Sequence, residues 1–177
     1  MRRFLWFVFG LVVGVVLTLG IPALVIEAGG IGMSAIEGPR GIEKLVGPWV
    51  YDRWVQTHAK NIENPLRGNA AAQAAGLEHY EESCVLCHAA PGVKLTAIAR
   101  GLDPYPPNLW EEDSQEMTDG QLFLVAKEGV RMTGMPAFGV THSDQEIWQM
   151  VAFIRHLPQI TPQEQKKLRE AVESRAH

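Results

Sequence analysis

The most restrictive feature of the sequence is the pentapeptide Cys84-Val85-Leu86-Cys87-His88. Two thiols three residues apart can share one helical turn, so that each forms a thioether with a vinyl group on one edge of a porphyrin. The histidine that follows then lies beneath the iron and can offer an imidazole nitrogen. This spacing predicts covalent attachment of one haem c through Cys84 and Cys87, with His88 as an axial ligand.

Three other interpretations of the two cysteines are open. A zinc site would need two histidines from elsewhere, because the chain contains only two cysteines. A thioredoxin-like dithiol would be expected within strand–helix alternation, which the surrounding sequence lacks. A small structural disulfide is the third. The five residues favour haem, and the remainder of the chain strengthens that prediction.

The N-terminus carries an uncharged run from Phe4 to Ile26, directly after Arg2 and Arg3. A helix of about 20 apolar residues crosses a bilayer, whereas the apolar core of a cleaved signal peptide has only about 7–15 residues. Residues 1–26 are therefore predicted to be a retained transmembrane signal anchor, with a cleaved signal peptide as the alternative. Small residues at Gly10 and Gly14 would let another transmembrane helix approach closely.

The two arginines are expected to stay in the cytoplasm, which places the rest of the chain on the outer side of the membrane. Covalent haem attachment takes place outside the bacterial cytoplasm, in agreement with this topology. We therefore expect a single-pass protein of the bacterial cytoplasmic membrane whose haem domain faces the periplasm.

Residues 27–69 are expected to form a linker that contains an amphipathic helix. Leu45 and Trp49 recur at helical spacing, and Trp54 continues the stripe. Because proline fits best in a first turn, Pro48 predicts that this helix starts near Gly47. Two roles are open for it: a membrane-interface helix or docking face for a partner, and packing against the haem domain.

A compact domain is predicted for residues 70–160, and it begins with a helix-forming run from Ala70 to Cys87. Almost thirty residues after His88 lack periodicity, which suggests that the chain folds around a haem. Two capping boxes, Thr118 with Gln121 and Ser143 with Glu146, predict a helix from Asp119 to Glu128 and another that ends before Pro158. Residues 161–177 are predicted to form a charged, solvated helix.

A second chemical site is predicted at Met135, which lies between Gly134 and Pro136 in an irregular segment. A thioether is a soft, neutral ligand that stabilises ferrous haem. Met135 is therefore expected to be the sixth iron ligand, with Met132 the next choice. The nearby Arg131 either pairs with a haem propionate or is solvated. The remaining histidines at 58, 79, 142 and 156 are expected at the surface or at helix ends.

By these marks, residues 70–160 resemble a monohaem class I cytochrome c. Gly76 and Tyr80 match a glycine and an aromatic that, in that family, cross a C-terminal helix bearing another aromatic, here Phe153 and also Trp148. The resemblance implies an all-α fold around one covalent haem. It further implies that the Pro107 carbonyl, in the segment Pro107-Asn108-Leu109, accepts the Nδ1–H of His88. The expected haem-binding residues are Cys84, Cys87, His88, Pro107, Leu109, Arg131 and Met135, with His88 and Met135 as iron ligands.

An iron held by His88 and Met135 has no free coordination position, so the predicted function is single-electron transfer by a membrane-tethered carrier rather than catalysis. Of 16 basic residues two precede the apolar run, which leaves 14 against 20 acidic residues and a net charge of −6 outside the membrane. This favours redox partner proteins with basic docking faces, such as membrane respiratory complexes, and not nucleic acid. One alternative is a fixed haem subunit of a larger respiratory or dehydrogenase complex. Another is a catalyst in which Met135 is displaced.

Overall fold

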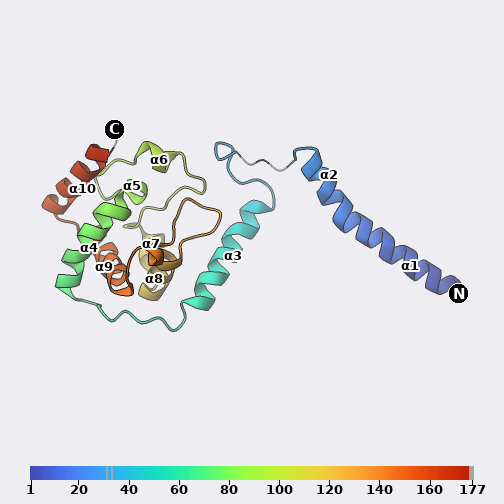
Figure 1. The fold of residues 1–177 in the computed structure, drawn as a ribbon, viewed down its shortest axis with the longest axis horizontal. Coiled ribbons are helices and arrows are strands. Elements are labelled where there is room, and N and C mark those ends of the chain that lie inside the picture. The colour runs from blue at the N-terminus through green and yellow to red at the C-terminus, as the bar shows by residue number, and fades with distance from the viewer. Residues whose placement is uncertain (31, 33, 176–177) are drawn as a thin grey trace. The chain divides into compact units, whose positions relative to one another are not determined.

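The computed structural model describes residues 1–30, 32 and 34–175, and its contacts divide the chain into two units, Met1–Glu37 and Gly38–His177 (Figure 1). Within the described residues the regular elements are helical, apart from one isolated bridge between Ala90 and Val93. This agrees with the predicted all-α fold. In chain order the α-helices are α1 (Arg2–Val15), α2 (Ile21–Glu27), α3 (Glu43–His58), α4 (Ala70–Ser83), α5 (Val85–His88), α6 (Ala97–Arg100), α7 (Glu112–Glu116), α8 (Asp119–Glu128), α9 (Asp144–His156) and α10 (Pro162–Arg175).

The first unit is dominated by one continuous helix of 26 residues, Arg2–Glu27. It joins α1 and α2 through the π-helical turn η1 (Val16–Gly20). At 1.5 Å per residue this helix is about 39 Å long, more than the roughly 30 Å of a bilayer's hydrocarbon core. None of its residues is buried, so its apolar side chains are available to lipid. By length and composition it can cross a membrane as the sequence predicts.

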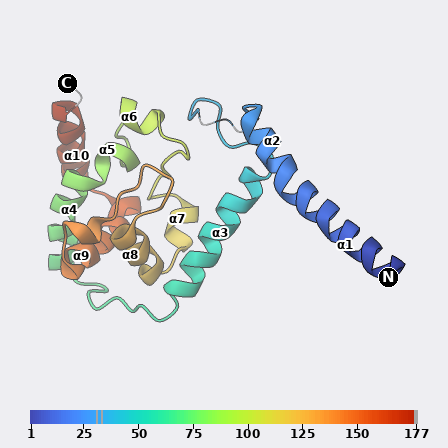
Figure 2. The same cartoon turned by 45° about the vertical axis from the view of Figure 1, so that its right-hand side comes forward.

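The core of the second unit is built on the crossing of α4 and α9, seen in both views of the fold (Figures 1 and 2). Gly76 permits the close approach, because a Cβ at this position would lie 1.9 Å from the carbonyl oxygen of Gln149. The rings of Tyr80 and Phe153 then meet at 5.3 Å between centroids. The expected crossing is confirmed for Phe153. Trp148 instead stacks on another ring, that of Phe123 in α8, at 4.1 Å.

Both predicted capping boxes are present. The hydroxyl of Thr118 accepts from the backbone N–H of Gln121, and the side chain of Gln121 accepts in return from the Thr118 N–H. Ser143 and Glu146 repeat the arrangement at the start of α9. The bounds of α8 are those predicted. Gly129, at φ +66°, ends this helix in a conformation that side chains rarely adopt.

Helix α3 starts earlier than predicted, at Glu43, and Pro48 lies inside it. Pro48 is the sixth residue of this helix and has no N–H group, so it removes one intrahelical hydrogen bond. The helix has two different ends. Val55 near its C-terminus is buried at 3% exposure, whereas Trp49 is 66% exposed. The C-terminal half packs on the domain and contacts α8. Of the two roles predicted for this helix, packing against the haem domain is therefore found, but only for its C-terminal half.

The prediction of a solvated C-terminal helix is wrong. Leu168, Ala171 and Val172 of α10 are buried, with Leu168 fully inaccessible to solvent. These positions are spaced i, i+3 and i+4, so they share one face of the helix. That face contacts α4 and α5, and Lys167 adds an ion pair with Glu81 of α4 at 3.0 Å. The packed unit is therefore larger than residues 70–160.

Candidate functional site

The Cys-x-x-Cys-His segment forms a single helical turn directly after α4. Cys84 caps α4, and its carbonyl oxygen accepts from the backbone N–H groups of Cys87 and His88 at 3.1 and 2.9 Å. Neither cysteine is in a disulfide; Cys84 is buried and Cys87 is partly exposed. The two thiols and the imidazole therefore project from one turn, as thioether attachment requires.

His88 is fixed by a contact with the loop segment around Pro107. Its Nδ1 lies 2.8 Å from the carbonyl oxygen of Pro107. A carbonyl can only accept, so Nδ1 carries the proton and the lone pair is on Nε2. Burial lowers the pKa of His88 while the bond to Pro107 raises it in part, so the ring is neutral at physiological pH. The contact implied by the resemblance is present, and the tautomer is the one that can bind a metal through Nε2.

Two side chains clamp the turn that carries His88. The Tyr80 hydroxyl donates to the carbonyl oxygen of Ala89 at 2.7 Å, which holds Ala89 at φ +52°, an unfavourable value for a residue with a Cβ. Thr96 donates to the carbonyl oxygen of Leu86 at 2.6 Å. The chain is thus held on both sides of Cys87, by Tyr80 of α4 after it and by Thr96, the N-cap of α6, before it.

The structure weighs against the other interpretations of the cysteines. Burial, with a smaller contribution from Cys87, raises the pKa of the Cys84 thiol to about 12, whereas redox-active dithiols have lowered values. Among the described residues no group of three or more His, Cys, Asp or Glu side chains is placed to hold a metal ion. Within the part of the chain that the structure describes, a zinc site built on these cysteines lacks its remaining donors.

Met135 lies in an irregular loop between α8 and the 3-10 turn η2 (Phe138–Val140). Its backbone N–H donates to the Thr133 hydroxyl at 3.1 Å, and its carbonyl accepts from Val130 at 3.2 Å. Gly129 makes room for the loop, since a Cβ there would lie 2.8 Å from the Met135 carbonyl oxygen. The Met135 side chain is half-buried, whereas that of Met132 is 90% exposed. This difference favours Met135 over Met132 as a ligand.

The remaining predicted site residues differ in their surroundings. Leu109 is partly buried against the core, and Arg131 is exposed. The histidines at 58, 79, 142 and 156 are near helix ends or at the surface, and none forms a metal-binding cluster with other described residues. His156 ends α9 and is paired with Glu164 at 2.9 Å.

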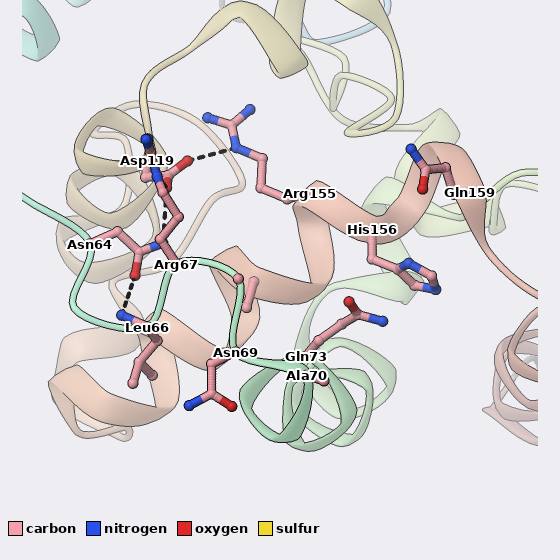
Figure 3. Close-up of a pocket in the computed structure, with 12 residues that line it drawn as sticks. Asn64, Leu66, Arg67, Asn69, Ala70, Gln73, Asp119, Arg155, His156 and Gln159 are labelled. Carbon is pink, nitrogen blue, oxygen red and sulfur yellow. Dashed lines mark hydrogen bonds and ion pairs between the residues drawn. The ribbon is translucent and has the colours of Figure 1, made fainter.

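Sequence reasoning missed two polar side chains that support the site. Gln115 of α7 donates to the carbonyl oxygens of Leu109 and Ile154, at 2.6 and 3.0 Å, and so ties the Pro107–Leu109 segment to α9. Asp119 opens α8 and accepts from Asn64, Arg67 and Arg155. Figure 3 shows Asp119 bonded directly to Arg155, and both residues line a cleft. An acidic residue in a first helical turn indicates only a favourable interaction with the helix dipole, so these longer-range contacts could not be predicted.

The donor set fits a haem c. Two thiols on one turn, a neutral imidazole with its Nε2 free of any hydrogen bond to described residues, and a thioether in a second loop are the groups that such a haem needs. The arrangement of α4 against α9 supports the same conclusion. Together, fold and motif define a c-type cytochrome domain, and the N-terminal helix provides its membrane anchor.

Comparison with known proteins shows what that domain is similar to. Residues 71–154 match the family model described as cytochrome c oxidase, cbb3-type, subunit III. The matched segment runs from the start of α4 to near the end of α9 and includes Cys84, His88 and Met135. None of the curated proteins matches the chain significantly. The protein is accordingly a membrane-anchored cytochrome c whose domain is similar to this family and whose activity is haem-based electron transfer.

Proposed function

We propose that this protein transfers single electrons through one haem c ligated by His88 and Met135, on the periplasmic side of the cytoplasmic membrane. The observation that carries the proposal is the 2.8 Å contact between His88 Nδ1 and the Pro107 carbonyl, which leaves Nε2 directed to bind iron. When bound, the haem supplies an iron that changes between the ferric and ferrous states. Filled axial positions would leave no place for a substrate.

The chain's own residues would keep the site unchanged during electron transfer. Cys84 and Cys87 hold the porphyrin edge, and Pro107 keeps the His88 ring in one orientation. The loop of Met135 is held by Thr133 and Val130. Because small rearrangement on oxidation favours fast electron exchange, a site fixed by backbone contacts suits a carrier.

The charge of the exported part supports redox partners with basic docking faces. Its net charge is −6, and the propionates of a bound haem would make it more negative. Electron transfer to such partners should slow as ionic strength rises, because salt screens the attraction between the two surfaces.

The decisive test is purification of the protein from native membranes, followed by spectroscopy and intact-mass analysis. We expect one covalent haem, an unprocessed N-terminus and the weak far-red absorption band of a sulfur–ferric iron bond. Rapid cyanide binding to the ferric protein without that band would contradict the assignment of Met135 and favour catalysis. A mass without added porphyrin would contradict the proposal as a whole.

The family match favours a second candidate, a fixed electron-transfer subunit of a respiratory complex, because the family is named for an oxidase subunit. The chemistry would be the same, but the protein would not diffuse between partners. Mild detergent extraction and size analysis separate the two. A lone protein–detergent particle supports the carrier, whereas stable co-purification with other membrane subunits supports the fixed subunit.

A further inference from the structure

Helix α3 carries apolar side chains on two opposite faces, of which only one is covered by the domain. Tyr51, Trp54 and Val55 are spaced i, i+3 and i+4 and form the covered face. Ile42, Leu45, Val46 and Trp49 are spaced i, i+3, i+4 and i+7, and we call them the outer stripe. Their exposures are 76, 74, 44 and 66%. Successive helical positions advance by about 100°, so the outer stripe lies on the side opposite the covered face.

From this geometry we propose that the outer stripe of α3 binds the outer surface of the lipid bilayer in which the chain's own N-terminal helix is inserted. The domain would then rest on the membrane through the first two turns of α3. The inference depends on the membrane anchor and does not depend on the identity of the redox partners or of the sixth iron ligand.

Chain connectivity brings the stripe to the membrane. The membrane-spanning helix ends at Glu27 and the stripe begins at Ile42, 15 residues later. A chain of that length reaches at most about 50 Å even when fully extended. Once the N-terminal helix is inserted, binding of the outer stripe to the same membrane is intramolecular and takes place at a high effective concentration of lipid surface. A patch of four side chains is therefore sufficient for binding.

The composition of the stripe also suits a headgroup interface. Tryptophan favours the depth at which headgroups meet acyl chains, and Trp49 is the largest exposed side chain of the stripe. Residues 40–60 contain four basic and two acidic residues, whereas residues 61–177 contain 10 basic and 16 acidic residues. The positive segment is thus the one that carries the stripe, as expected for contact with anionic lipid headgroups.

Site-directed spin labelling of the full-length holoprotein in vesicles of phosphatidylcholine and phosphatidylglycerol tests the proposal. Both native cysteines are used in haem attachment, so a cysteine introduced by Val46→Cys is the single free thiol. Glu173→Cys is the matched control: this position is exposed on α10, and Figures 1 and 2 place α10 on the side of the domain away from α3. For each spin label, the rate of collision with oxygen, which concentrates in lipid, is compared with the rate of collision with a water-soluble nickel chelate.

We expect the label at position 46 to collide more with oxygen than with the chelate, and the label at position 173 to show the reverse. Adding Trp49→Glu to Val46→Cys should return position 46 to the solvent-exposed pattern, while the haem absorption spectrum stays unchanged. Equal chelate access at both positions would overturn the proposal. So would protection of position 46 from both reagents, because that result indicates a protein surface, either a partner or a second copy of the chain.

Discussion

The two sides of the candidate haem site are held in different ways. The His88 side is built by long-range packing: the turn lies under the α4–α9 crossing, His88 is 8% exposed, and Pro107 and Tyr80 reach it from elsewhere in the chain. On the Met135 side the hydrogen bonds are local and run from Val130 to Met135, although Gly134 also lies close to Leu102. One predicted ligand is therefore fixed by the fold as a whole, and the other is held mainly by its own loop. Substitutions on the first side should affect folding, and those on the second should affect the iron's properties.

The largest effect is expected from Gly76→Ala in the α4–α9 crossing. The added Cβ would overlap the Gln149 carbonyl, and the cost of overpacking is about 1–3 kcal/mol, here towards the upper end. The same substitution at Gly47 in α3 is the control, since no atom lies within 4 Å of a Cβ built there. Gly47→Ala should be neutral or stabilise by up to about 1 kcal/mol. Chemical denaturation of both variants measures the difference, and equal stabilities would contradict the packing described for Gly76.

Met135→Ala should leave stability almost unchanged but lower the reduction potential. Loss of the thioether removes the ligand that favours ferrous iron, and axial ligands set haem potentials over a range of about 0.8 V. We expect a fall on the order of 0.1 V or more and loss of the far-red band. Met132→Ala is the control, because this exposed side chain should change neither quantity. An unaltered potential in Met135→Ala would show that another group binds the iron.

A matched pair of smaller changes compares the two sides directly. Gln115→Leu leaves the carbonyls of Leu109 and Ile154 without their donor and should cost about 1–3 kcal/mol of folding free energy. Thr133→Val removes a hydroxyl that serves only its own loop and should cost about 1 kcal/mol. Thr133→Val should nevertheless accelerate cyanide binding to the ferric protein more than Gln115→Leu does. The reverse order of cyanide rates would contradict the local character of the Met135 side.

The smallest effect concerns pH and a contact remote from both ligands. Burial would raise the pKa of Asp119, but hydrogen bonds from Asn64 and Arg155 outweigh it and hold the pKa below its ordinary value of about 4. A carboxylate whose pKa is lower in the folded than in the unfolded state stabilises the protein at pH values above the unfolded-state pKa. This stabilisation is lost as the pH falls through the folded-state pKa. Melting temperatures of the wild type should therefore fall below about pH 4, with a smaller decline in Asp119→Asn. An identical acid profile in the variant would show that Asp119 contributes nothing.

The sequence predicted those parts of the fold that depend on local chemistry. The bounds of α8 followed from the capping box at Thr118 and the glycine at position 129, and the turn of His88 followed from the cysteine spacing. The packing of α10 was missed because half of its residues are charged, although the spacing of Leu168, Ala171 and Val172 was visible. The contacts of Gln115 and Asp119 could not be predicted, because each joins segments more than 35 residues apart.

The crossing at Gly76 also has a consequence for the order of events during biogenesis. The segment that buries Cys84 includes α9, whose first residue lies 60 positions further along the chain. If the domain is exported behind its N-terminal anchor, as proposed, both thiols reach the far side of the membrane before their covering helix does. An enzyme that joins them to a porphyrin therefore has an interval in which the two sulfur atoms stand open, and the interval closes when the C-terminal third arrives.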